Sequence, residues 1–267
     1  MTNNNSTVAT PPGIDPKGKN CIITGGAGGI GSSLARILHK EGAKNIILAD
    51  KVDSNKTAKE VFGKSYTLDV GSKNEMKKFI QSVQNEFGQI DIFFGNAGIA
   101  NKDDHTISEE RWNQIWQVNV AQHMYAAREL IPGMLNRGSG WFVITASAAG
   151  LLSQVGSVSY STTKHAAVGF AEWLAITYGD RGIGTSVLCP QGVRTAMTAA
   201  MKNGGVAGID GMLEPEEVAN ITIKSIKKGI FLITPHNVVR EYQKLKIENP
   251  ERWIKGMRKL YKKYGDW

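Results

Sequence analysis

Tyr160, Lys164 and Ser147 combine side-chain types that can move a proton. Tyr160 and Lys164 stand four positions apart in a segment with a helical pattern, so they share one helix face. A phenol has a pKa near 10, and general-base catalysis near neutral pH needs that pKa lowered by about 3 units, roughly 4 kcal/mol. The ammonium of Lys164 would supply this effect. Ser147, at the end of an apolar run, could hydrogen-bond a substrate oxygen.

A glycine-rich segment near the N-terminus predicts a phosphate-binding turn. It follows a short apolar run and precedes a helical pattern, which is the context of a dinucleotide fingerprint. Glycines permit the sharp turn and let backbone N–H groups approach a pyrophosphate at the helix N-terminus. The cofactor contacts predicted in this turn are Thr24, Gly25, Gly28, Gly29, Ile30 and Gly31.

Asp50 indicates which dinucleotide the turn would hold. It ends the second strand pattern, 19 residues after Gly31. A carboxylate at this point accepts hydrogen bonds from the adenosine ribose and repels a 2′-phosphate, so NAD is favoured over NADP. Lys51 follows directly and would soften the preference, which leaves its strictness open.

Short apolar runs alternate with helical patterns along the chain. Most runs are continuously apolar, as expected for strands covered on both faces. We therefore predict an α/β fold with a single doubly wound Rossmann-type domain, a parallel sheet of about seven strands and helices on both faces. The strand candidates are residues 20–25, 45–50, 65–70, 90–98, 141–147, 185–190 and 230–235.

One domain is expected over residues 17–267, because no linker or internal repeat interrupts it. Residues 1–16 are polar and predict a disordered tail. The Gly- and Met-containing segment 192–213 lies where this fold places a substrate lid. Residues 237–267 predict a basic helical segment broken at Pro250.

Charge and cysteine content limit the classes of function. The formal net charge is +8, and residues 221–267 contain 12 basic against 4 acidic residues while the rest is balanced. This basic segment could be a solvated helix face, or it could attract an anionic substrate through Arg252, Lys255, Arg258 and Lys259. Two cysteines form no disulfide framework, and the five histidines lack metal-ligand spacing. We expect a cytoplasmic protein without metal, membrane or nucleic-acid partners.

The chain resembles the classical short-chain dehydrogenase/reductase family over about residues 17–235. Thr24, Gly25, Gly29 and Gly31 match the T-G-x-x-x-G-x-G pattern, and Tyr160 and Lys164 match Tyr-x-x-x-Lys. Ser147 lies 13 residues before Tyr160, as in the family. The remaining matching element is Asn96, Ala97 and Gly98.

The resemblance implies further roles. Asn119 would hold a water that relays protons toward the lysine, and Asp69 and Val70 would contact adenine. Two departures stand out: Gly95 replaces the first Asn of Asn-Asn-Ala-Gly, and Gln191 interrupts the Pro-Gly that follows the sixth strand. The nicotinamide amide would be met by Val193 and held near Thr195, and the cofactor would also be contacted by Pro190, Gly192 and the segment Asn96, Ala97 and Gly98.

We therefore expect an oxidoreductase that moves a hydride between NAD(H) and a secondary alcohol or ketone. Tyr160 would act as general acid/base, assisted by Lys164, Ser147 and Asn119, with Tyr160 and Lys164 also contacting the cofactor. Proteins it resembles are usually homodimers or homotetramers. The alternative is a non-catalytic dinucleotide-binding protein that recruits a polyanion through its basic C-terminus.

Overall fold

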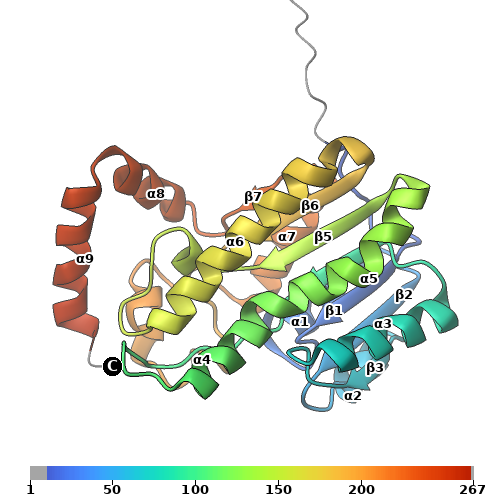
Figure 1. The fold of residues 1–267 in the computed structure, drawn as a ribbon, viewed down its shortest axis with the longest axis horizontal. Coiled ribbons are helices and arrows are strands. Elements are labelled where there is room, and N and C mark those ends of the chain that lie inside the picture. Colours follow the sequence, from blue (N-terminus) through green and yellow to red (C-terminus); the bar gives the residue numbers. More distant parts are fainter. Residues whose placement is uncertain (1–10, 266–267) are drawn as a thin grey trace, which may run out of the picture.

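Seven parallel strands form one sheet in the order β3-β2-β1-β4-β5-β6-β7 (Figure 1). The computed structural model describes residues 11–265. Strand order reverses between β1 and β4, and ligands of such sheets bind beyond the carboxyl ends at this switch point. The strands are β1 (Asn20–Thr24), β2 (Asn45–Asp50), β3 (Lys64–Thr67), β4 (Ile92–Gly95), β5 (Gly140–Thr145), β6 (Ile183–Leu188) and β7 (Leu232–Ile233).

The predicted doubly wound parallel sheet is confirmed, although β4 covers only Ile92–Gly95 of the predicted 90–98 and the two edge strands are also shorter than expected. We predicted strands over 65–70 and 230–235, but β3 ends at Thr67 and β7 contains only Leu232 and Ile233. An edge strand pairs on one side only, so fewer ladder hydrogen bonds hold its ends in the sheet.

Helices cover both faces of the sheet and enclose two apolar cores (Figure 1). One core lies under α1, α2 and α7, and the other under α3, α5 and α6. The helices are α1 (Gly29–Lys40), α2 (Asn55–Glu60), α3 (Lys73–Phe87), α4 (Glu109–Trp116), α5 (Gln122–Arg137), α6 (Val158–Tyr178), α7 (Pro215–Lys227), α8 (Val238–Glu248) and α9 (Pro250–Tyr264).

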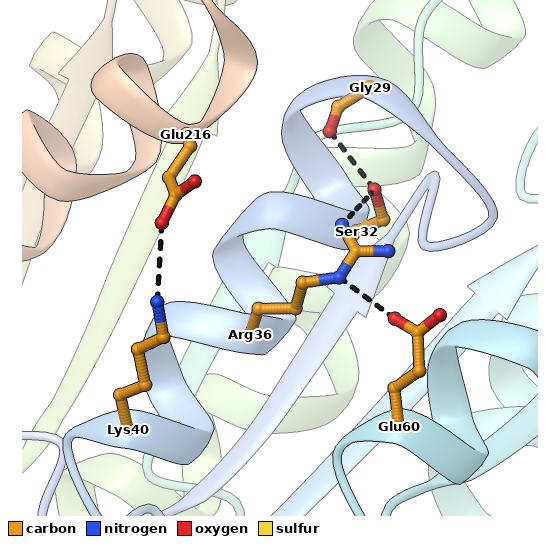
Figure 2. Close-up of polar contacts among 6 residues, drawn as sticks. All are labelled: Gly29, Ser32, Arg36, Lys40, Glu60 and Glu216. Atoms are coloured by element: carbon orange, nitrogen blue, oxygen red, sulfur yellow. Dashed lines mark hydrogen bonds and ion pairs between the residues drawn. The ribbon is translucent and has the colours of Figure 1, made fainter.

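Helix α1 is fastened to its neighbours on both sides (Figure 2). Arg36 Nε lies 2.8 Å from Glu60 Oε2 of α2, and Lys40 Nζ lies 3.2 Å from Glu216 Oε1 of α7. Exposed ion pairs of this kind contribute little stability individually. The two pairs lie on opposite flanks of α1, while its buried side chains, among them Leu34 and Leu38, hold the helix on the sheet.

Residues 11–16 correct the expectation of a disordered tail over 1–16; residues 1–10 lie outside the described residues. The backbone N–H of Ile14 donates to Ile226 O of α7 at 2.9 Å, and the Ile14 side chain is buried. Gly13 permits this approach, since a Cβ there would overlap the Lys227 carbonyl. One buried isoleucine and one close backbone contact order this segment.

The C-terminal segment forms two helices at the side of the molecule (Figure 1). Asn249 separates them and caps α9 by accepting from the backbone N–H of Arg252 at 2.9 Å. Pro250 is the first residue of α9, where its missing N–H costs nothing. The break therefore falls where the sequence indicates.

Candidate active site

The turn after β1 needs glycine at several positions. Gly25 and Gly29 have φ of +70° and +55°, in the left-handed region that favours glycine. A Cβ on Gly31 would overlap the Gly25 carbonyl oxygen, so only glycine lets the helix start this close to the strand. The local sequence thus forces the chain from β1 directly into the N-terminus of α1.

The first turn of α1 fits a negatively charged group. Gly28 is the N-cap and supplies no side-chain cap, so the first backbone N–H groups lack intrahelical acceptors. No atom lies within 4 Å of where a Gly28 Cβ would be, and the site is open. The Ser32 hydroxyl donates to Gly29 O at 3.2 Å and holds the turn (Figure 2). Open N–H groups at the positive end of a helix suit a pyrophosphate.

Asp50 lies beside this turn, at the carboxyl end of β2. Its Oδ2 accepts from the Ala27 N–H at 3.0 Å and its Oδ1 from the Val52 N–H at 3.2 Å. Two backbone donors orient the carboxylate. Lys51 points elsewhere, because its Nζ lies 3.3 Å from Asp69 Oδ2.

The two predicted adenine contacts differ in exposure. Val70 is buried and belongs to the core under α3, whereas Asp69 is partly exposed and accepts from the Gly71 N–H at 2.8 Å. Asp69 also neutralises Lys51. This is an exposed surface pair that orients the Lys51 side chain toward β3.

Thr24 joins the carboxyl ends of β1 and β4. Its Oγ1 accepts from the N–H groups of Asn96 and Ala97 at 2.9 and 3.0 Å and donates to Gln122 Oε1 at 2.8 Å. Gln122 Nε2 in turn donates to Ala97 O at 2.7 Å. The Asn96 amide donates to Thr24 O at 3.1 Å. This buried network fixes the Asn-Ala-Gly segment against the glycine-rich turn.

Gly95, the first departure from the family pattern, makes room for a histidine. A Cβ at Gly95 would overlap Nδ1 of His123, which is fully buried in α5. Burial lowers the pKa of His123 to about 3, so the ring is neutral. Gly95 and the buried His123 therefore depend on each other, because a side chain at position 95 would leave no room for the histidine.

Asn119 lies in a π-helical turn, Gln117–Ala121, between α4 and α5. Its side-chain oxygen accepts from the Ile99 N–H at 2.9 Å, and its amide donates to Ile99 O at 3.0 Å and to Thr163 Oγ1 at 3.1 Å. A Cβ on Gly98 would lie 3.3 Å from Lys164 Nζ and 3.5 Å from Asn119 Oδ1. Gly98, Asn119 and Lys164 thus converge. π-turns occur frequently at functional sites.

Ser147, Tyr160 and Lys164 come together at the carboxyl end of β5. Lys164 is 3% exposed, its Nζ donates to Thr145 O at 2.9 Å, and it lies 5.5 Å from the centre of the Tyr160 ring. Ser147 Oγ donates to Pro190 O at 3.4 Å and accepts from the Ala149 N–H at 3.1 Å. The three side chains predicted to move a proton therefore share one site.

The pKa values differ from the sequence-based expectation. Burial raises the pKa of Tyr160, and a hydrogen bond with Ser147 offsets this only in part. Burial also lowers the pKa of Lys164 to about 8. The expected depression of the Tyr160 pKa is thus absent, because desolvation outweighs the hydrogen bond with Ser147.

The segment after β6 meets the glycine-rich turn. A Cβ on Gly29 would lie 3.1 Å from Thr195 Cγ2, which places Thr195 over that turn. Val193 is buried and pairs with Leu213 at the base of segment 192–213. Gly192 has no room for a side chain, because a Cβ would overlap Met212 Sδ.

Two supporting residues were missed from the sequence. Gln122 bridges Thr24 and Ala97, and Asp103 binds the start of α6 through Ser159, whose N–H donates to Asp103 Oδ1 at 3.0 Å. Neither Gln122 nor Asp103 belongs to one of the family motifs that the sequence matches. A polar residue inside the apolar face of α5 was the only signal that could have identified Gln122.

Residues 19–204 match the family model described as short chain dehydrogenase. The chain is 28% identical over 197 residues to the 3-oxoacyl-(acyl-carrier-protein) reductase FabG of Escherichia coli (strain K12), covering 72% of this chain and 81% of that protein. It is 28% identical over 222 residues to 3beta-hydroxysteroid dehydrogenase 2 of Eggerthella lenta, covering 76% and 85%. A crystal structure of a short chain dehydrogenase/reductase from Burkholderia phymatum in complex with NAD superimposes with a TM-score of 0.79 at 26% identity, covering 89% and 96%.

The fold and these matches define an oxidoreductase built on a Rossmann fold. More narrowly, the chain belongs to the short-chain dehydrogenase/reductase family, as its motifs indicate. Its members bind a nicotinamide dinucleotide, for which the open first turn of α1 is suited.

Residues 11–265 contain neither a candidate membrane span nor a candidate metal cluster. No helix among them is both long and apolar enough to cross a bilayer. Within the same residues, no group of three or more His, Cys, Asp or Glu side chains is arranged to hold a metal ion.

Proposed function

We propose that this chain transfers a hydride between NAD(H) and a secondary alcohol or ketone, with Tyr160 as general acid/base. The observation that supports this most directly is the shared position of Ser147, Tyr160 and Lys164 at the carboxyl end of β5. A bound nicotinamide supplies the hydride acceptor or donor. During oxidation, Tyr160 takes the hydroxyl proton while the carbon–hydrogen bond breaks, and reduction reverses both.

The other residues have separate tasks in this proposal. Ser147 holds the substrate oxygen, and the ammonium of Lys164 stabilises the Tyr160 phenolate. The side chain of Asn119 is already used by Ile99 and Thr163. The relay water stays assigned to Asn119 as the family resemblance implies. Because burial alone raises the pKa of Tyr160, the positive charge of the oxidised cofactor is needed for the phenolate to form near neutral pH.

NAD is the cofactor we favour, because Asp50 is oriented by two backbone donors and Lys51 is paired with Asp69. We also propose self-association: Trp173 and Ile176 of α6 are 51% and 84% exposed, an apolar surface a second copy could cover. The buried free thiols of Cys21 and Cys189 suit a reducing cytoplasm. The polyanion-recruiting alternative is not favoured, since it has no use for a Tyr–Lys–Ser group.

The test is turnover with a panel of secondary alcohols and NAD, followed by the absorbance of the reduced nicotinamide. NADP is run in parallel. Wild type should reduce NAD with at least one alcohol, and Tyr160→Phe should bind NAD without turning over. Equal turnover by both proteins would remove Tyr160 from the mechanism.

A further inference from the structure

A cavity of about 250 Å³ opens beside Ser147, and apolar side chains make up most of its walls. Leu152 and Val155 come from the turn after β5, and Ile209 comes from segment 192–213. The remaining wall belongs to α8 and α9, which lie beyond the residues matched by the family model. A substrate whose oxygen contacts Ser147 would place its body here.

Helix α9 turns its apolar face toward this cavity. Trp253, Met257 and Leu260 line it and are spaced by four and three residues, which puts them on one helix face. Tyr261, the residue after Leu260, points away from this face and is 57% exposed. Four basic side chains could have attracted an anionic substrate, but all are exposed and none lines the cavity: Arg252, Lys255, Arg258 and Lys259.

The lining contains no Lys, Arg, His, Asp or Glu among the described residues. Its polar members include the amides of Gln154 and Gln191. A carboxylate or phosphate held in this cavity would lose water without gaining an opposite charge, which is costly. The anionic-substrate hypothesis therefore finds no support in the cavity.

Hydrogen bonds tie α8 to both other walls. Asp210 of segment 192–213 accepts from Tyr242 Oη at 3.0 Å and from Gln191 Nε2 at 2.8 Å. Lys246 Nζ donates to Leu151 O at 2.6 Å. Gln191, the second departure from the family pattern, thus helps to fasten the segment. Because α8 is fixed at both sides, α9 is held over the cavity.

Charged side chains gather in an adjoining depression, which shares Ser153, Gln154 and Val155 with the cavity. This larger depression of about 1030 Å³ is lined by Lys102, Asp104, His105 and Arg111, among others. None of Ser147, Tyr160 and Lys164 lines it. The charged side chains therefore line the neighbouring depression, whereas the cavity beside Ser147 has an uncharged lining.

We propose that α8 and α9 form the specificity-determining wall of the substrate site, and that the substrate is a neutral secondary alcohol or ketone with a compact apolar ring. Trp253 is the principal contact with that ring. The inference rests on the proposed function for the identity of the reacting group. The preference of the cavity for a neutral ring can be tested separately, by measuring binding without turnover.

The test compares wild type, Trp253→Ala and Trp253→Phe on three alcohols: isopropanol, a tert-butyl-substituted cyclohexanol, and a cyclohexanol with a carboxylate opposite its hydroxyl. Wild type should prefer the neutral ring over the carboxylate by about tenfold or more in kcat/KM. Trp253→Ala should lose about 10- to 100-fold on the neutral ring, mainly through KM, because pocket contacts of this size discriminate to that extent. Its activity on isopropanol and its affinity for NAD should stay within about threefold of wild type, and Trp253→Phe should recover most of the loss.

Ile254→Ala is the matched control, because Ile254 is the next residue of α9, is 58% exposed and does not line the cavity. It should behave like wild type. A wild type that prefers the carboxylate, or a Trp253→Ala loss that is equal on isopropanol and the ring, overturns the proposal. Calorimetric titration of the neutral ring ketone into NADH-loaded protein separates the two ideas. If the ring ketone binds, Trp253→Ala weakens that binding and no alcohol is turned over, then α8 and α9 form the substrate wall but the proposed reaction is wrong. If isopropanol is turned over but the ring ketone does not bind, then the proposed reaction holds and the role of α8 and α9 is wrong.

Discussion

Lys164→Met should abolish turnover with NAD, yet it should make the apo protein more stable at pH 7. Lys164 is 3% exposed, and burial lowers its pKa from 10.5 to about 8. At about 1.4 kcal/mol per pKa unit, the charged side chain costs the folded state about 3 kcal/mol below pH 8. Losing the hydrogen bond to Thr145 O costs about 1 kcal/mol. The net expectation is a gain of about 2 kcal/mol in the free energy of unfolding.

The difference in stability between wild type and Lys164→Met should depend on pH in a defined direction. Between pH 8 and 10.5 the unfolded chain binds more protons at Lys164 than the folded chain, so wild-type stability rises with pH. The advantage of the Met variant should therefore be complete below pH 8 and disappear as pH approaches 10.5. Urea unfolding of the apo proteins at pH 7 and pH 10 measures it. Lys78→Met, on the exposed surface of α3, is the control and should change little. A Lys164→Met variant less stable than wild type at pH 7, or a difference that does not shrink with pH, would refute the argument.

Three further outcomes follow from the site. Tyr160→Phe should lower kcat/KM for oxidation by about 100-fold or more while the NAD dissociation constant from fluorescence titration stays within about threefold; residual turnover near wild type would contradict this. Asp50→Ala should narrow the ratio of kcat/KM for NAD over NADP by about tenfold, and an unchanged ratio would assign the preference elsewhere. Gly95→Ala should destabilise the protein by about 2 kcal/mol in urea unfolding because its Cβ overlaps His123, and adding His123→Ala should restore most of that loss; simple additivity would rule out the packing explanation.

The sheet and the position of the site could be predicted because both depend on local pattern. Continuously apolar runs such as 45–50 are the signature of strands covered on both faces, and β2 has those bounds. The glycine-rich turn is likewise local, since the conformations of Gly25 and Gly29 permit few other residues. The i, i+4 spacing of Tyr160 and Lys164 brought them together once α6 formed.

Interactions between distant segments could not be predicted in the same way. The ordering of residues 11–16 depends on Ile226, more than two hundred positions away, and the space for His123 depends on the absence of a side chain at Gly95. The pKa of Tyr160 was misjudged for a related reason. The sequence shows the neighbouring Lys164, but the extent of burial, which dominates, is a property of the assembled fold.

Helix α9 marks the limit of periodicity as a guide to function. The spacing of Trp253, Met257 and Leu260 identifies an apolar face, yet it does not say whether that face meets the core, another subunit or a ligand. In the structure no residue of α9 is fully buried, although these three side chains are partly covered and line the cavity. An apolar face that packs against the core leaves no free volume, whereas this one borders a space beside Ser147. The role that we propose for α9 in substrate selection therefore rests on this free volume more than on the hydrophobicity of the helix. The basic residues of α9 lie on its other faces and are exposed to solvent.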